Sequence, residues 1–166
     1  MDIVVDTNIL FSALTYSRTV QRLLTRLYKE GHTLHAPTEL IVELEKHRNK
    51  IERFSPLPPR LLKDIIKEVL PRILYLHPTN KIPSSTINKA KRLVEAVDPS
   101  DWPFVALAIY LNVPLWTGDK QLIRLALKTG EFRAVDTHGV EMLLEGRSWH
   151  EVEEEMRKRY LRESRL

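Results

Sequence analysis

The sequence of 166 residues contains no cysteine, which excludes disulfide bonds, thiolate zinc sites and cysteine nucleophiles. It also lacks the unbroken run of about 18 apolar residues that a membrane-spanning helix requires. No basic stretch precedes the short apolar segment at the N-terminus, as it would in a secretion signal. These absences predict a cytoplasmic protein with no membrane association. Ten prolines, two glutamines and abundant Lys, Arg and Glu favour a heat-adapted source.

The sequence motifs of several enzyme classes are absent as well. The chain contains no GxGxxG, no GxxxxGK[ST] and no GxSxG, which argues against dinucleotide-binding, P-loop and α/β-hydrolase sites. Its six histidines show no HExxH or comparable metal-binding spacing. We therefore interpret most of them as ordinary surface or packed residues.

Positive charge is unevenly distributed along the chain. The net charge of +4 and the isoelectric point near 9.4 suit a polyanionic partner without requiring one. Between Val69 and Val94 there is no Asp or Glu, whereas five residues are Lys or Arg. This stretch is either an ordinary solvated face or a surface that follows phosphates. The second interpretation makes Lys89, Lys91 and Arg92 weak candidates for RNA binding.

The hydrophobic pattern alternates between short strand-like runs and helical periods. The expected strands are Ile3–Val5, Thr33–Ala36, Val113–Thr117 and Ala134–Val135; a fifth is Ile73–Leu76, where the run is so short that strand and helix are hard to separate. The helices expected between them include Val20–Tyr28, Leu40–Ile51, Leu61–Val69 (ending before Pro71), Ile87–Val97, Phe104–Leu111 and Leu122–Lys128. Strands separated by helices at this spacing indicate crossover connections. The pattern therefore predicts an α/β fold with a mostly parallel sheet covered on both faces.

The chain is expected to form one domain, because it has no internal repeat, low-complexity tract or long linker. After Gly146, the residues Ser148 and Glu151 form a capping box, which predicts the start of another helix. That helix is acidic in its first half and basic in its second, as the helix dipole favours. We predict that residues 1–146 form the main body and that residues 147–166 form a C-terminal helix docked on it.

Several acidic residues stand at positions where a carboxylate is costly or unusual. Asp6 closes the first expected strand and Asp119 follows the fourth, at the edge where parallel sheets bind ligands. Taken singly, each could simply make a turn or cap the next helix. Asp98 and Asp101 frame the turn DPSD, where helix capping is again the plain alternative. Glu43 lies at the edge of a buried helical stripe, although it could be an ordinary surface residue.

The interpretation changes if Asp6, Glu43, Asp101 and Asp119 converge in space. Two like charges 4 Å apart repel by about 4 kcal/mol at an effective dielectric constant of 20. Such a cluster requires protonation or a bound cation, and hard oxygen ligands favour Mg²⁺ or Mn²⁺. A metal held in this way can activate water and neutralise charge on a phosphodiester. With the basic surface, the acids predict hydrolysis of nucleic acid.

Three segments together resemble the PIN-domain family: VVDTNIL, TELIVELEKH and DPSDWPFVALAIYLNVPLWTGDKQL. They occur in that family's order and approximate spacing, over about residues 3–137. The resemblance implies a three-layer α/β/α fold around a mostly parallel sheet, so that residues 1–146 would be a PIN-like nuclease domain. It also implies an Mg²⁺- or Mn²⁺-dependent endoribonuclease, such as a VapC-type toxin with an antitoxin partner, or an RNA-processing nuclease. A homodimer or higher homo-oligomer is implied in the same way.

The four acids of the family's site match residues of this chain. The first matches Asp6, the helical glutamate matches Glu43, and the third and fourth match Asp101 and Asp119; these are the expected catalytic residues and metal ligands. Asp98 competes with Asp101 for the third position and is kept as an additional metal ligand.

Two polar residues of the chain match positions that support the family's site. Asn8 and Thr117 are expected to hydrogen-bond the first and fourth carboxylates. The chain is longer than a minimal toxin of this family, in its middle and at its tail.

Two other functions fit parts of the sequence. The first is a catalytically inactive RNA-binding or interaction module on the same fold, although all four acids are present. The second is an aspartyl phosphotransfer protein with Asp6 as phospho-acceptor. Asn8 stands where the DxD pattern of haloacid dehalogenases has its second Asp, which argues against this function.

Overall fold

A five-stranded parallel sheet forms the centre of the molecule, in the strand order β3-β2-β1-β4-β5. The computed structural model describes residues 1–161. The strands are β1 (Asp2–Val5), β2 (Thr33–Pro37), β3 (Leu74–His77), β4 (Leu115–Trp116) and β5 (Ala134–Val135). All five expected strands are confirmed, with their ends shifted by up to two residues.

Strand β1 lies in the middle of the sheet and of the core. Ile3, Val4 and Val5 are fully buried, because neighbouring strands flank them and helices cover both faces of the sheet. A strand buried on both faces is apolar at successive positions rather than at alternate ones. This explains why the most hydrophobic opening segment of the chain reads IVV without interruption.

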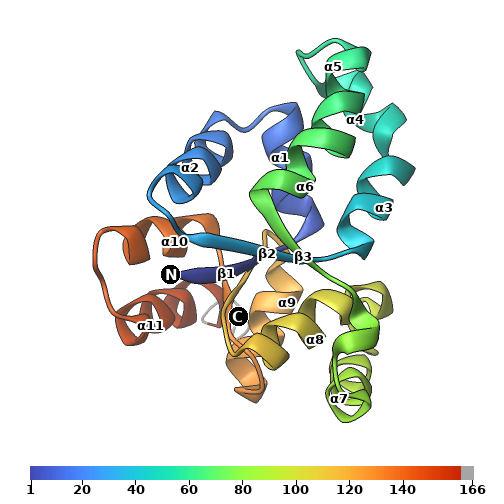
Figure 1. Cartoon of the computed structure of the whole chain (residues 1–166). Helices are drawn as coiled ribbons and strands as arrows, with labels where there is room; N and C mark the ends of the chain where they lie inside the picture. The colour runs from blue at the N-terminus through green and yellow to red at the C-terminus, as the bar shows by residue number, and fades with distance from the viewer. Residues whose placement is uncertain (162–166) are drawn as a thin grey trace.

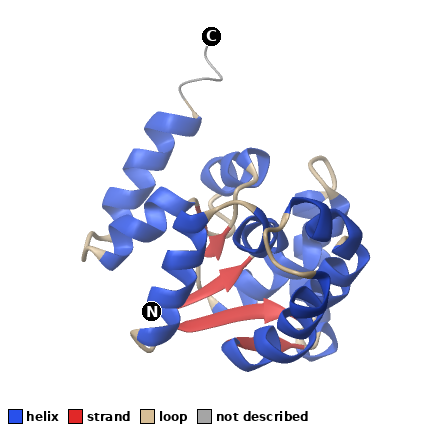
Figure 2. Ribbon diagram, turned by 90° about the horizontal axis from the view of Figure 1, so that it is seen from above, coloured by secondary structure: helices blue, strands red, loops and turns tan. Residues whose placement is uncertain are grey.

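Helices cover the sheet on both sides (Figure 1). On one face lie α1 (Thr7–Thr15) and α2 (Arg18–Lys29); on the other lie α7 (Ser84–Val94), α8 (Trp102–Leu111) and α9 (Lys120–Thr129). Viewed from above, the strands lie side by side in the middle of the molecule with helices around them (Figure 2). The expected three-layer α/β/α architecture is therefore confirmed. None of the helices within residues 1–161 is both long and apolar enough to cross a bilayer.

The connection from β2 to β3 contains several short helices and differs from expectation in two places. Its elements are α3 (Glu39–Lys46), α4 (Arg48–Phe54), α5 (Pro59–Asp64), the π-helical turn η1 (Ile65–Val69) and α6 (Leu70–Ile73). The single helix expected over Leu40–Ile51 is wrong, because the chain divides at His47 into α3 and α4. The helix end expected before Pro71 is also wrong. Pro71 lies in the first turn of α6, where a missing backbone N–H costs little.

Two short 3₁₀ helices complete the middle of the chain, namely η2 (Thr79–Lys81) and η3 (Pro99–Asp101). After β5 the chain forms α10 (Thr137–Leu144) and α11 (Trp149–Tyr160). The Ser148 hydroxyl accepts a hydrogen bond of 3.2 Å from the Glu151 amide, which confirms the expected cap. Helix α11 packs against α9 and α10 and buries Val152 and Met156 completely. Residues 162–166 of the expected C-terminal helix lie outside the described residues.

Candidate active site

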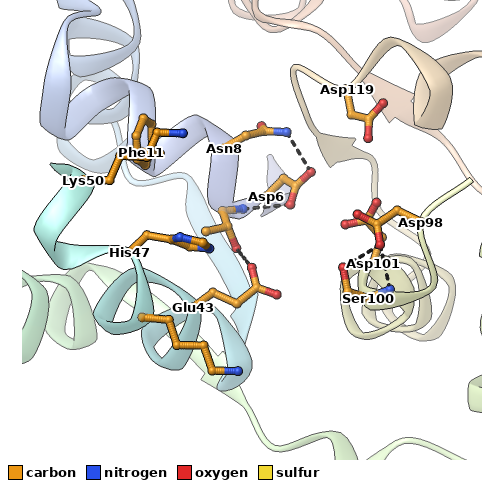
Figure 3. A pocket seen from close by; sticks show the side chains of 12 residues that line it. Asp6, Asn8, Phe11, Glu43, His47, Lys50, Asp98, Ser100, Asp101 and Asp119 are labelled. Atoms are coloured by element: carbon orange, nitrogen blue, oxygen red, sulfur yellow. Dashed lines mark hydrogen bonds between the residues drawn. The ribbon is translucent and has the colours of Figure 1, made fainter. Parts of the chain in front are cut away.

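The carboxyl ends of β1 and β4 meet where the strand order reverses. The chain passes from β1 to β2 and β3, then returns to place β4 on the other side of β1. Such a switch point is the usual ligand site of a parallel sheet. A pocket of about 500 Å³ lies there. The acidic residues that line it are Asp6, Glu43, Asp98, Asp101 and Asp119 (Figure 3).

Asp6 directly follows β1, and only 4% of its surface is exposed. Its Oδ2 atom accepts hydrogen bonds from the Thr117 hydroxyl (2.7 Å) and from the Asn8 side-chain amide (3.3 Å). Its Oδ1 atom accepts one from the backbone amide of Thr7 (2.8 Å). Burial nevertheless raises the pKa of Asp6 to about 6, against the opposite effect of these hydrogen bonds. The carboxylate is thus well positioned but has no positive partner among the groups that bind it.

Asn8 and Thr117 connect the ends of β1 and β4. The Asn8 side-chain oxygen accepts a hydrogen bond from the Gly118 amide (3.0 Å), and its Nδ2 atom also reaches the Thr117 hydroxyl (3.3 Å). The Thr117 hydroxyl in turn accepts a hydrogen bond from the backbone amide of Asp119 (3.0 Å). Both residues therefore hold Asp6 directly, whereas Thr117 holds Asp119 only through its main chain.

Glu43 enters the pocket from α3. Its Oε2 atom accepts a short hydrogen bond of 2.6 Å from the hydroxyl of Thr7, which is the first residue of α1. This contact across 36 residues of sequence turns Glu43 toward the pocket rather than toward open solvent. Glu43 is therefore not an ordinary surface residue, because its side chain lines the pocket.

Asp98 and Asp101 lie three residues apart but have different surroundings. Asp98 caps η3, because its Oδ1 atom accepts hydrogen bonds from the Ser100 amide (3.0 Å) and hydroxyl (2.7 Å). Asp101 stands at the cap position of α8, yet its side chain makes no capping hydrogen bond. Its Oδ2 atom is buried and has no hydrogen-bond partner among the described residues.

The pKa of Asp101 is raised to about 8, mainly by burial and then by the charges of the other pocket acids, Asp6 first. Asp98 accepts hydrogen bonds within its own turn, whereas the Asp101 side chain makes no capping hydrogen bond. The interpretation as a helix cap therefore fits Asp98 better than Asp101. Asp101 is the carboxylate left free for the pocket.

Asp119 has two roles that are compatible with each other. Its Oδ1 atom accepts hydrogen bonds from the Gln121 and Leu122 amides (2.9 and 3.3 Å), so it caps α9 as an ordinary N-cap residue would. The same side chain borders the pocket opposite Glu43 and above Asp98 in Figure 3. The capping alternative is thus correct for one oxygen and does not remove Asp119 from the site.

The donor set suits a hydrated divalent cation. Within residues 1–161, no three acidic or histidine side chains stand close enough together to coordinate one ion jointly. Mg²⁺, however, commonly binds through one or two carboxylates and keeps several water molecules, so an open set of hard oxygen donors is appropriate for it. The unpartnered Asp101 oxygen and the raised pKa values of Asp6 and Asp101 mark carboxylates whose charge is not compensated by the groups that contact them.

Two of the three basic residues expected to bind RNA, Lys89 and Lys91, contact other side chains of the chain. The Lys89 ammonium forms an ion pair with Glu131, and that of Lys91 lies 4.7 Å from the centre of the Trp102 ring. Neither these two residues nor Arg92 lines the pocket. Their part in RNA binding stays a prediction.

The structure instead brings other side chains to the pocket, which the sequence reasoning missed. These are Lys46, His47 and Lys50, together with Phe11. The signal available for them was the basic run KHRNK, which begins three residues after Glu43.

Comparisons with known proteins concern the family and the fold of the chain. A family model described as PIN domain matches residues 4–156. The crystal structure of VapBC2 from Rickettsia felis, bound to a DNA fragment from their promoter, is similar with a TM-score of 0.63 at 16% identity, covering 82% of this chain and 98% of that one. The structure of FitAB bound to an IR36 DNA fragment is similar with a TM-score of 0.60 at 14% identity, covering 81% and 94%. At such identities the two structures show a shared fold alone. No curated protein matches the chain closely enough to count as a relative.

Proposed function

The chain belongs to the PIN-domain family, and from that premise we propose that it is an Mg²⁺- or Mn²⁺-dependent endoribonuclease that hydrolyses RNA phosphodiester bonds. One observation carries the proposal. Five carboxylates line one pocket at the switch point of the sheet, and the side chains that hold them by hydrogen bonds are uncharged. A buried acidic group without compensation is unfavourable, and a cation that arrives with the substrate would relieve it.

Asp6, Glu43, Asp101 and Asp119 are the proposed catalytic residues and metal ligands, with Asp98 as an additional ligand. A divalent ion bound there would supply charge neutralisation at the phosphodiester and a more acidic water molecule. The residues of the chain do the positioning. Thr117 and Asn8 fix the Asp6 carboxylate, and the Thr7 hydroxyl fixes Glu43, so each presents its free lone pairs toward the pocket. Within residues 1–161 the Asp101 Oδ2 atom has no hydrogen-bond partner, so it is free to bind the ion or to accept a proton.

We further propose that the enzyme is the toxin of a toxin–antitoxin pair of the VapBC type. The support is the family itself and the fold shared with the VapBC2 and FitAB structures. The proposed partners are RNA and an antitoxin protein, and the proposed assembly is a homodimer or higher homo-oligomer. A small reading frame for an antitoxin next to the gene would be the first observation to seek.

Incubation of the protein with labelled single-stranded RNA in Mn²⁺ or Mg²⁺, with and without EDTA, tests the nuclease. We expect cleavage that EDTA abolishes and that Asp119→Asn lacks. The matched control is Asp64→Asn, because Asp64 is exposed at the end of α5 and outside the pocket. RNA binding without cleavage in either metal would instead favour the inactive RNA-binding module.

A further inference from the structure

One wall of the acidic pocket is basic and aromatic. Lys46 is the last residue of α3, His47 separates α3 from α4, and Lys50 lies in α4. All three line the pocket together with Phe11 of α1. Figure 3 shows Phe11, His47 and Lys50 on the side opposite Asp98, Asp101 and Asp119, with Asp6 and Glu43 between the two sides. Lys46 and Lys50 are four residues apart and stand on either side of the division at His47, which the sequence did not predict.

The two lysines of this wall are not committed to the fold. Both are exposed, and within residues 1–161 neither forms an ion pair. The neighbouring Arg48 shows the contrast, because it pairs with Glu45 (3.4 Å) and Glu52 (3.7 Å) on its own helices. The Lys50 ammonium lies 5.5 Å from the centre of the Phe11 ring, over its face.

A strand of nucleic acid that crosses this pocket meets two different surfaces. At the carboxylates a phosphate can approach only through a cation, whereas at the opposite wall the ammonium groups attract a phosphate directly. His47 can donate a ring N–H in either charge state, so it adds a donor to the same wall. A partly exposed phenylalanine beside such a cation is the arrangement on which an unpaired base stacks. A base within a duplex is already stacked and paired, and so cannot use it.

Resting on the proposed function, we propose that Lys46, His47, Lys50 and Phe11 form a substrate subsite. It holds the phosphate and the base that adjoin the scissile phosphodiester of single-stranded RNA. The wall at the junction of α3 and α4, rather than the basic face of α7, is then the main phosphate contact of the enzyme. Lys89 and Lys91 of α7 are engaged by Glu131 and Trp102, as described above.

The experiment compares four proteins: the wild type, Lys46→Ala/Lys50→Ala, Lys89→Ala/Lys91→Ala, and Lys63→Ala/Lys67→Ala as a matched control on exposed residues outside the pocket. Binding of a short fluorescein-labelled single-stranded RNA is measured by anisotropy in EDTA, over a range of salt concentrations. We expect Lys46→Ala/Lys50→Ala to bind about 10-fold more weakly. The slope of its log affinity against log salt should become shallower by about 0.7 for each phosphate that the lysines no longer neutralise. Lys89→Ala/Lys91→Ala should lose less affinity than Lys46→Ala/Lys50→Ala, and Lys63→Ala/Lys67→Ala should bind within about 2-fold of the wild type.

Phe11→Ala tests the stacking part of the subsite. We expect it to weaken binding of the single strand by about 5-fold or more without changing the salt dependence. The same RNA annealed to its complement should bind more weakly than the single strand and should not respond to Phe11→Ala. Thermal denaturation of each variant shows whether it remains folded.

Two results would overturn the subsite: unchanged binding by Lys46→Ala/Lys50→Ala, or an equal or larger loss of affinity in Lys89→Ala/Lys91→Ala. Failure of the subsite and failure of the proposed function are distinguishable. A wild type that cleaves RNA, with KM unchanged in Lys46→Ala/Lys50→Ala, contradicts the subsite alone. A wild type that never cleaves, but whose binding falls in that variant, contradicts the nuclease and supports the subsite.

Discussion

Two buried aspartates follow strands of the same sheet, Asp6 after β1 and Asp136 after β5. The groups that surround their carboxylates are of opposite kinds. Asp136 follows β5 and is 7% exposed, much like Asp6 after β1. The Asp136 carboxylate is bound by the Arg159 guanidinium, by the Tyr160 hydroxyl (2.7 Å) and by the Gly139 amide (2.7 Å). Asp6 receives hydrogen bonds from uncharged groups and faces other acids.

The difference shows what separates a structural acid from a functional one at a strand end. The chain supplies the counter-charge of Asp136 itself, through α11, so this acid fastens the C-terminal helix to the sheet. It supplies no such charge to Asp6 or to the Asp101 Oδ2 atom. A buried carboxylate left in that state costs stability unless something outside the chain compensates it. A buried acid at a strand end therefore indicates a functional site when no positively charged side chain binds it.

The largest effect should follow from removal of an uncompensated acid. Asp101→Asn is expected to lower the rate of RNA cleavage by about 100-fold or more, because a charge that serves the metal and the transition state is removed. The melting temperature should stay the same or rise slightly, because no partner loses an ion pair. Cleavage assays and thermal denaturation of the same preparation measure both. A large drop in stability would contradict the contrast with Asp136.

The reverse pattern is expected when the compensated acid loses its partner. Arg159→Ala leaves Asp136 nearly buried without its cation, and should cost about 1–3 kcal/mol of unfolding free energy after allowance for the partly exposed Arg159 side chain. Cleavage per folded molecule should be unchanged, since both residues lie outside the pocket. Urea denaturation measures the change in stability. Addition of Asp136→Asn should cost less than the sum of the two single changes; full additivity would mean that the ion pair does not stabilise α11.

The stability of the metal-free protein should depend on pH. The folded-state pKa of Asp101, about 8, lies above its ordinary value of 3.8, so the folded state binds this proton more tightly. Its stability contribution is fully present below about pH 4 and is lost as the pH rises through about 8. In EDTA, the melting temperature should therefore fall between about pH 5 and 8, by about 2–4 °C for each kcal/mol of stability that disappears.

Two additions check that prediction. Mn²⁺ or Mg²⁺ should raise the melting temperature most at the high end of this range, where the carboxylates are charged. Asp101→Asn should flatten the metal-free profile. A wild-type profile in EDTA that rises steadily from pH 5 to 8 would show that the Asp101 proton does not govern stability there.

Much of this molecule could be predicted from its sequence, for identifiable reasons. Strand β1 was visible because a strand buried on both faces reads as a continuous apolar run, and Asp6 and Asp119 stood out because each follows an expected strand. The choice between Asp98 and Asp101 was not decidable in sequence, since it depends on which carboxylate Ser100 engages.

The basic wall of the pocket was missed for a different reason. The periodicity of Leu40, Leu44 and Ile51 fits one helix as well as two, so the division at His47 was invisible. The end expected before Pro71 failed because proline also fits the first turn of a new helix.

The smallest effect concerns the Tyr160 hydroxyl, which donates a hydrogen bond of 2.7 Å to the Asp136 carboxylate. Tyr160→Phe should cost about 0.5–1.5 kcal/mol near neutral pH, because Asp136 keeps Arg159 and loses only one donor. Burial, with the hydrogen bond to Asp136, raises the pKa of Tyr160 from 10.0 to about 12. The folded state thus holds the phenolic proton more tightly, and this part of the stability is lost as the pH rises from about 10 through 12. Denaturation midpoints of the wild type and Tyr160→Phe should converge over that interval. A constant gap between them would show that the folded state does not raise the pKa of Tyr160.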